Sequence, residues 1–294
     1  MIGSGIAGRA VPAEQSEASR TPQMQSLVGP LLTLATYAIA FIFFFPILWT
    51  LLSGFKTEVD AGASPPLLFF HPTLANYHSA LLETDYFDFF KNTVILAIGS
   101  TVLAFLLGVP AAYSLAIYST KRTKGTLTWV LSTKMMPIVG VIVPIFVIYR
   151  NIGLLDSRLG MVFLYAAMNM PLVIWMMHSF FTEVPRPILE AAGVDGAGVG
   201  TILTRVVLPI SGPGLASTGL ICLIFSWNEF FLAYMLTAGN AGTLPIYLVR
   251  FMSSHGQSLA SMSAASTIAI APVFIAGWSA QRALVRGLTM GAVK

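Results

Sequence analysis

Few residues in this chain have the types and spacing needed for catalysis or metal binding. The four histidines are dispersed, with no pair at the i, i+4 spacing of a zinc-binding helix. Cys222 is the only cysteine, and no GxSxG motif marks a nucleophile. Gly3, Gly5 and Gly8 spell GxGxxG, but no strand pattern precedes them. We predict that the chain is no enzyme, carries no metal or cofactor, and lacks a P-loop of its own.

Two ionisable residues, Lys134 and Glu229, lie within long apolar runs. A charge at membrane depth costs about 3 kcal/mol on insertion scales, so each such residue needs a reason to be there. Because their charges are opposite, an ion pair would relieve both desolvation costs. The pair is interpreted in two ways, as a structural contact that fixes helix packing or snorkels to an interface, or as part of a substrate path.

Further polar and aromatic groups lie in the later apolar runs, with Gln281 and Tyr234 among them. Amides bind hydroxyl groups and aromatic faces bind the C–H side of a sugar or polyol. Asparagine within a membrane is equally well known as a helix–helix contact. The candidate substrate-path residues are Lys134, Asn169, Trp227, Asn228 and Glu229.

The composition places most of this chain in lipid. Of 294 residues 56% are hydrophobic and only 10% are charged, too few charges to cover a soluble domain. The net charge of +4 is spread out, which indicates no nucleic-acid site. Six stretches are long enough to cross a bilayer. They are Leu27–Leu52, Asn92–Ile117, Leu127–Tyr149, Met161–Phe181, Gly214–Leu236 and Ala264–Ala283.

The lysines and arginines predict the orientation of these spans. With the N-terminus inside, ten of the 16 fall in cytoplasmic segments and five in outer ones. Both termini are therefore predicted to be cytoplasmic, with residues 1–26 a disordered tail, 27–284 the membrane domain and 285–294 a C-terminal tail. The segment 53–91 becomes an outer loop with a short amphipathic helix around Asn76, placed to face a delivering protein.

A polar island, EAAGVDGAGVGTILTRVVLP, interrupts the apolar runs at residues 190–209. Pro187 suits the first turn of a helix that we expect to end near Val194. Gly196 and its neighbouring glycines permit a sharp turn, and a second helix is predicted over 201–207. The loop 185–212 is thus predicted to be a helix–turn–helix shelf, with a re-entrant or interfacial connector as the alternative.

This island resembles the signature loop of the membrane subunits of ATP-binding-cassette importers. The form is EAA, three residues, Gly196, and Leu-Pro after a further eleven, and Val206 stands where isoleucine is usual. The resemblance implies an all-α integral membrane protein of the type I importer permease fold, with six transmembrane helices and a cytoplasmic coupling helix. The implied ATPase-coupling residues are Glu190, Ala191, Ala192, Asp195, Gly196, Leu208 and Pro209.

Two other segments resemble carbohydrate permeases. The ending GLTMGAVK, residues 287–294, is similar to the maltose-importer second permease, and residues 132–160 are similar to sorbitol and mannitol permeases. The resemblance implies a permease subunit in a bacterial inner membrane that imports a carbohydrate, with a polyol expected. Its partners would be a second permease, an ATPase dimer that binds ATP and Mg²⁺, and an extracytoplasmic binding protein. The alternatives are an ion-coupled secondary transporter that uses Lys134 and Glu229, and a membrane enzyme that no motif supports.

Overall fold

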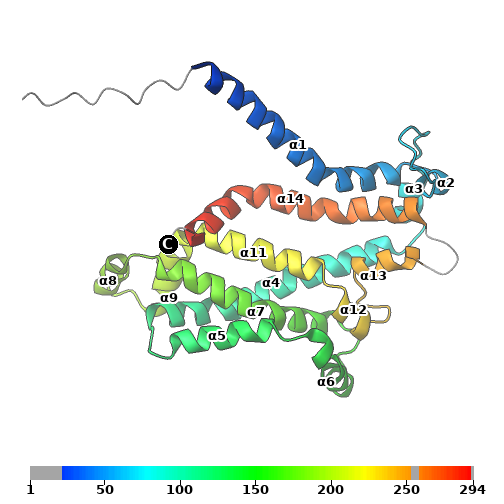
Figure 1. Ribbon diagram of the computed structural model, residues 1–294. Coiled ribbons are helices and arrows are strands. Elements are labelled where there is room, and N and C mark those ends of the chain that lie inside the picture. Colours follow the sequence, from blue (N-terminus) through cyan, green and yellow to red (C-terminus); the bar gives the residue numbers. More distant parts are fainter. Residues whose placement is uncertain (1–21, 253–257, 293–294) are drawn as a thin grey trace, which may run out of the picture. The chain divides into compact units, whose positions relative to one another are not determined.

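The computed structural model describes the backbone of residues 22–252 and 258–292, and side chains within 29–252 and 258–281. All the regular elements in these ranges are helices (Figure 1). The longest are α1 (Pro22–Gly54), α4 (Tyr86–Ile117), α7 (Arg158–Thr182) and α14 (Leu259–Ala292). The shorter ones are α2 (Glu58–Ala61), α3 (Ala75–Leu82), α5 (Thr123–Lys134), α6 (Ile138–Asn151), α8 (Arg186–Val194), α9 (Val199–Ile202), a π-helix (Leu203–Val207), α10 (Leu208–Ile210), α11 (Gly212–Trp227), α12 (Phe231–Leu236), α13 (Leu244–Val249) and a 3₁₀ turn (Arg250–Met252). The tail predicted at 1–26 lies almost wholly outside the described residues.

The chain divides into two compact units, residues 1–49 and 50–294. The described part of the first is residues 22–49 of α1, whose side chains from residue 29 to 47 are all exposed and mostly apolar. The hydroxyls of Thr33 and Thr36 donate to the carbonyl oxygens of Gly29 and Leu32, so the helix satisfies them internally. An apolar surface with satisfied polar groups is what a lipid solvent requires.

The core of the second unit forms where α4, α7 and α11 lie side by side (Figure 1). Small residues let α4 and α7 approach closely: a Cβ on Gly108 would lie 2.8 Å from the side chain of Val173. Ala104, Ala112 and Cys222 are buried completely in the same cluster. Close backbone approach through small residues is how membrane helices gain packing energy where no hydrophobic effect acts between them.

Most predicted spans are confirmed, and the structure corrects two of them. Among the described residues, four helices are long and apolar enough to cross a membrane, or up to six if each of two bent helix pairs is counted as a span. The third predicted span, Leu127–Tyr149, is two helices, α5 and α6, that meet at 83°. Pro137 precedes α6 with an extended ψ of 117°, which a continuing α-helix cannot adopt. The fifth, Gly214–Leu236, ends as a helix at Trp227, and α12 follows as a separate short helix.

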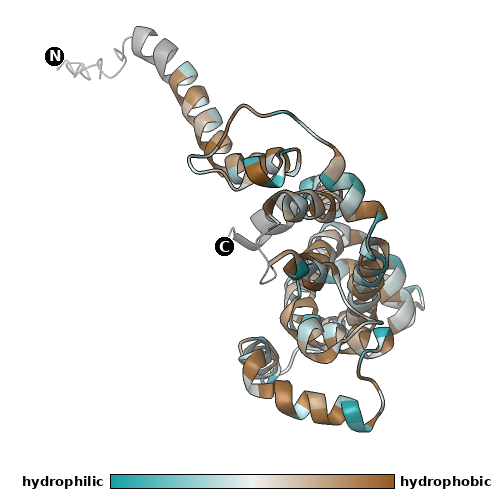
Figure 2. Ribbon diagram, turned by 90° about the vertical axis from the view of Figure 1, so that its right-hand side faces the viewer, coloured by the Kyte–Doolittle hydropathy of each residue, from teal (hydrophilic) through white to brown (hydrophobic). Residues whose placement is uncertain are grey.

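One end of the second unit carries α8 and α9, and the opposite end carries α6, α12 and α13 (Figure 1). The expected helix around Asn76 is α3, at this second end. The Asn76 amide donates to the carbonyl oxygens of Gly54 and Lys56 and so secures the start of the 53–91 loop. In Figure 2 brown, the hydrophobic end of the scale, recurs along the helical ribbons, and teal is sparser.

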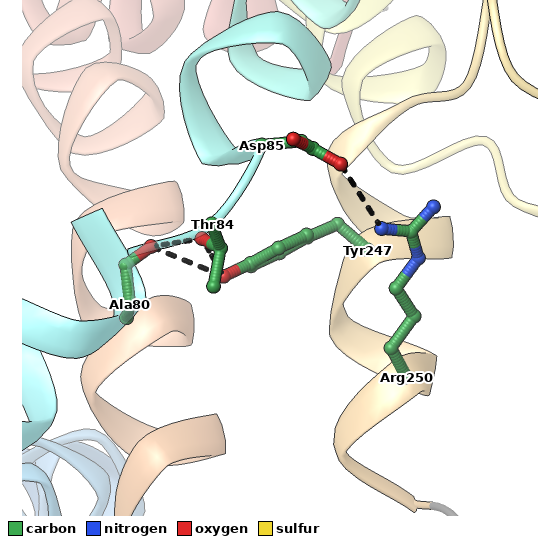
Figure 3. Close-up of polar contacts among 5 residues, drawn as sticks. All are labelled: Ala80, Thr84, Asp85, Tyr247 and Arg250. Atoms are coloured by element: carbon green, nitrogen blue, oxygen red, sulfur yellow. Dashed lines mark hydrogen bonds and ion pairs between the residues drawn. The ribbon is translucent and has the colours of Figure 1, made fainter. Parts of the chain in front are cut away.

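A small polar cluster joins α3 and α4 to α13 at that second end (Figure 3). The Tyr247 hydroxyl donates to the Ala80 carbonyl oxygen at 3.1 Å and lies 2.8 Å from Thr84 Oγ1. The Arg250 guanidinium is 3.9 Å from the Asp85 carboxylate, and both side chains are more than half exposed. Exposed pairs of this length contribute little, so the buried tyrosine is the main connection.

Candidate functional site

The polar island forms a shelf at one end of the membrane helices. Its first helix, α8, starts after Pro185 and has no buried residue. Leu189 packs against the core, whereas Ile188 is 42% and Val194 is 89% exposed. The nine-residue α8 therefore stands at this end of the molecule with part of its apolar surface uncovered.

The end of α8 is a Schellman motif. The Gly196 N–H donates to the Gly193 carbonyl oxygen at 3.1 Å, and the Ala197 N–H donates to that of Ala192 at 3.0 Å. Gly196 has a φ of +81°, a backbone conformation that residues other than glycine rarely adopt. The glycine predicted at the turn therefore sets the direction in which the chain leaves α8.

After the turn, a π-helical stretch leads into α11. The Leu208 N–H donates to the Leu203 carbonyl oxygen, five residues back. Pro209 has no N–H group to donate to the Arg205 carbonyl oxygen. The α-helical i→i−4 hydrogen bond is therefore missing at this point, where the π-helical turn occurs. The segment 199–210 then meets α11 at 82°. At this corner Gly214 lies against the ring of Phe180 on α7.

The structure brings most of the predicted coupling residues together on one exposed surface. Glu190, Ala191, Asp195 and Gly196 are exposed on α8 and its turn. Ala192 is half-buried between them. The other two lie apart on α10: Leu208 packs against the core and Pro209 is exposed. The surface of α8 is thus a compact patch with two carboxylates, while α10 connects it to α11.

The proposed pair of Lys134 and Glu229 is not formed, which corrects that hypothesis. Lys134 Nζ donates to the Met168 carbonyl oxygen at 3.0 Å and lies 5.0 Å from the centre of the Phe225 ring. The Glu229 carboxylate instead accepts from the Tyr165 hydroxyl at 2.8 Å and from two backbone N–H groups at the start of α12. Each charge is held by hydrogen bonds from its own surroundings, so the basis for ion coupling through this pair is removed.

Asn169 connects helices within the core. Its side chain is 2% exposed and donates to Ser226 Oγ at 2.8 Å. Ser226 Oγ in turn lies 3.0 Å from Ser100 Oγ, so α7, α11 and α4 share one polar contact. In this structure the position of Asn169 is that of a helix–helix contact.

Trp227 and Asn228 lie instead at a groove of about 650 Å³ between α11, α13 and α14. The Trp227 indole N–H donates to the Ala269 carbonyl oxygen at 3.2 Å, and the ring lines the groove. Trp278 and Gln281 line it from α14. Of the five candidate substrate-path residues, these two border an open space together.

Two features of the segment that runs from α5 to Asp156 were not singled out from the sequence. The exposed residues of α5 are mostly hydroxyl-bearing, although its segment was counted as an apolar span. The run of Thr and Ser between residues 126 and 133 was the signal for it.

The second feature is a carboxylate at the end of α6. Asp156, with a φ of +53°, accepts from the N–H groups of Gly239, Asn240 and Ala241 at 3.0–3.1 Å. Partial burial raises the pKa of Asp156, but the backbone N–H groups of residues 238–241 outweigh it and hold the pKa below its usual range. The signal is absent from the sequence, because the partners lie more than 80 residues away.

Comparison with known proteins now decides the family. Residues 104–290 match the family of binding-protein-dependent transport system inner membrane components. The chain belongs to this family. It is 34% identical over 262 residues to a probable ABC transporter permease, y4oR, of Sinorhizobium fredii, covering 89% of this chain and 94% of that protein. The trehalose/maltose transport system permease MalG of Thermococcus litoralis is 32% identical over 90% of this chain and 96% of its own length.

The fold agrees with that assignment. A bacterial ABC transporter involved in the import of the acidic polysaccharide alginate contains a chain with a TM-score of 0.72 and 23% identity, covering 91% of this chain and 99% of that one. The protein is therefore a helical, membrane-embedded permease of the type I importer fold and a non-catalytic component of its transporter.

Proposed function

We propose that this permease couples ATP hydrolysis by a separate subunit to the import of a carbohydrate, and that α8 is the helix on which the ATPase acts. The observation that carries the proposal is the exposed α8, which is closed by Gly196, follows α7 after a short turn and is joined to α11 through α9, the π-helix and α10. The chain itself has no P-loop, so the energy must come from a partner.

The assembly would contain a second permease, an ATPase dimer that binds ATP and Mg²⁺, and an extracytoplasmic binding protein. The shelf and both termini would be cytoplasmic, in a bacterial inner membrane. The basic residues support this orientation, because Lys121, Arg122, Lys124, Arg186 and Arg205 all flank the end that carries α8. The end with α3 and α13 would then face the binding protein.

The connections of α8 explain how a push becomes a movement. Val184 and Leu189, on either side of its start, pack against the core made by α4 and α7. The 82° corner before α11 transfers the same displacement to a second helix. A rigid-body shift of α8 would thus rotate α7 and α11 together, which is what alternating access requires.

The substrate we propose is a polyol such as sorbitol or mannitol. The resemblance of residues 132–160 to polyol permeases supports it. A disaccharide is the second candidate, supported by the relative named for trehalose and maltose. Both present a row of hydroxyl groups, so the choice between them is a matter for experiment.

The test is ATP hydrolysis by the assembled transporter in lipid with its binding protein. We expect a polyol to stimulate hydrolysis, and Gly196→Asp to abolish the stimulation although the protein still inserts. The variant places a charge at the contact and forces a side chain into φ +81°, at a cost of about 1–2 kcal/mol. Gly198→Ala is the control, since Gly198 has a φ of −72° and open space around it. Normal stimulation of ATP hydrolysis in the Gly196→Asp complex would contradict the coupling role of α8. Stimulation by a disaccharide but not by a polyol would contradict the proposed substrate.

A further inference from the structure

The exposed face of α5 is polar, and we call it the α5 polar face. Its residues, all exposed, are Thr126, Thr128, Trp129, Ser132 and Thr133. The helix lies alongside α7, a helix long and apolar enough to cross the membrane (Figure 1). The start of α5 lies beside Thr182 at the α8 end of α7, and its end lies beside Met168 and Pro171 in the middle of α7. The polar face therefore runs from that end into membrane depth.

The other long helices show what a lipid-facing surface looks like in this protein. Every exposed residue of α4 between positions 95 and 110 is apolar, with Ile98, Val102 and Leu106 from 51% to 66% exposed. On α7, Phe163 and Trp175 are 49% and 48% exposed. On α1 the self-bonded hydroxyls of Thr33 and Thr36 are isolated among apolar side chains, whereas on α5 four of the seven exposed residues carry a hydroxyl. This density, in place of exposed Leu and Ile, indicates a different solvent on the outer side of α5.

The hydroxyl groups of the α5 polar face all donate to their own helix. Thr126 and Thr128 bond to carbonyl oxygens four residues back, at 3.2 and 3.0 Å. Ser132 and Thr133 bond three residues back, each at 2.7 Å. A hydroxyl has one hydrogen and two lone pairs, so each oxygen remains an acceptor. The face thus presents a row of acceptors that fits a ligand rich in O–H donors.

An aromatic ring and a cavity complete this surface. Trp129 is 68% exposed, and its face can cover the C–H side of a sugar or polyol. At the far end of the helix, Thr133 and Lys134 line a cavity of about 440 Å³ beside α7. None of its lining residues, and none of the residues of α5, is acidic. This charge pattern suits a neutral or anionic solute and disfavours a cation.

We propose that the α5 polar face is one wall of the translocation path and contacts the hydroxyl groups of the transported carbohydrate. The inference rests on the proposed import function and assigns a site to it. Water fills the path when the solute is absent, and the row of acceptors exchanges water hydrogen bonds for solute ones at little cost. The Trp129 ring can stack on the carbohydrate in several positions, so the contact does not hold the solute at one place along the path.

Thiol labelling tests this placement in the assembled transporter in lipid. Cys222, the only native cysteine, is completely buried, so the unmodified protein supplies a low background. Single cysteines at Thr126, Ser132 and Thr133 should react with a charged, water-soluble thiol reagent. Cysteines at Val102 and Leu106 are the matched controls on α4. Because only the thiolate reacts and it forms in water, we expect rates at least about tenfold higher on α5.

A substrate arm separates this proposal from the proposed function. A transported polyol or disaccharide should slow labelling at Thr126 and Thr133, and Trp129→Phe should retain transport that Trp129→Ala weakens through a higher KM. Equal labelling on α4 and α5, or no labelling on α5, overturns the polar-face proposal while leaving ATPase stimulation intact. Loss of substrate-stimulated ATP hydrolysis in the unmodified complex, by contrast, contradicts the import function itself.

Discussion

The shelf and the α5–α6 segment are both bent helix pairs, and they differ in what holds the bend. The shelf turns into α11 at 82°, and α5 turns into α6 at 83°. The shelf was predicted from the sequence, whereas α5 and α6 were predicted to be a single span. The two angles are nearly equal, so the two bends differ only in the contacts that stabilise the segments around them.

The turns within the shelf are closed by contacts between near neighbours in sequence, and only its corner with α11 packs against a distant residue, Phe180. The Schellman bonds at Gly196 and the π-turn before Pro209 join residues at most five apart. Segment 123–156 is tied to distant parts of the chain instead. Lys134 bonds to Met168, and Asp156 bonds to residues 239–241. Local contacts can be recognised from residue types, but distant ones require the fold.

The largest loss of stability is expected from a substitution at the corner between the shelf and α11. Gly214→Ala would place a Cβ against the Phe180 ring, closer than real Cβ contacts come, so the ring or the two helices must shift. We expect a loss of about 2–3 kcal/mol in the free energy of unfolding. Thermal unfolding of the purified permease, followed by tryptophan fluorescence, measures it.

Gly212→Ala is the control two residues away, because no atom lies within 4 Å of its Cβ position. It should leave the midpoint unchanged or raise it slightly. Equal midpoints for the two variants would show that the contact between Gly214 and Phe180 does not set this corner.

A smaller effect is expected at the long-range contact that follows α6. Asp156→Asn keeps a residue that tolerates a φ of +53° but removes the negative charge from the ring of N–H donors. Hydrogen bonds to a charged group contribute about 1.5–3 kcal/mol, and partial exposure reduces this to about 1 kcal/mol here. The midpoint at pH 7 should fall accordingly.

The pH dependence gives the sign of the same prediction. Since the folded pKa of Asp156 is lowered, its stabilisation is complete above the unfolded pKa of about 3.9 and is lost as the pH falls through the folded value. The unmodified protein and Asp156→Asn should converge in that acid range. Asp85→Asn is the control, as its contact with Arg250 is long and exposed. A constant difference between Asp156→Asn and the unmodified protein at all pH values would contradict the charge argument.

The smallest effect is expected from a substitution within α8, where the contacts are local. Gly193 lies within α8, with open space around its Cβ position. Gly193→Ala should stabilise α8 by up to about 1 kcal/mol, since alanine loses less backbone entropy in a helix. Slower hydrogen exchange of the amides of residues 191–197 is the expected result, with no change in the unfolding midpoint. A change in global stability instead would mean that α8 is not a local unit.

Particular residues show how far prediction from the sequence reached. Pro187 and Gly196 marked the start and the turn of α8 correctly, because proline and glycine restrict or free the backbone wherever they occur. Lys134 and Glu229 were paired by their charges, and that was wrong, since Tyr165 and two backbone N–H groups were nearer partners for the acid. The substrate roles of Asn169, Trp227 and Asn228 stay predictions.

The sequence by itself determined that lipid is the solvent of most of this protein and that its polar island folds as a helix–turn–helix shelf. Both follow from composition and from the local conformations of glycine and proline, which act over a few residues. The tertiary structure alone decided that α5 turns a hydroxyl-bearing face outward. Hydropathy averaged over a window cannot show which face of a helix its neighbours cover, because that depends on packing between segments distant in the chain.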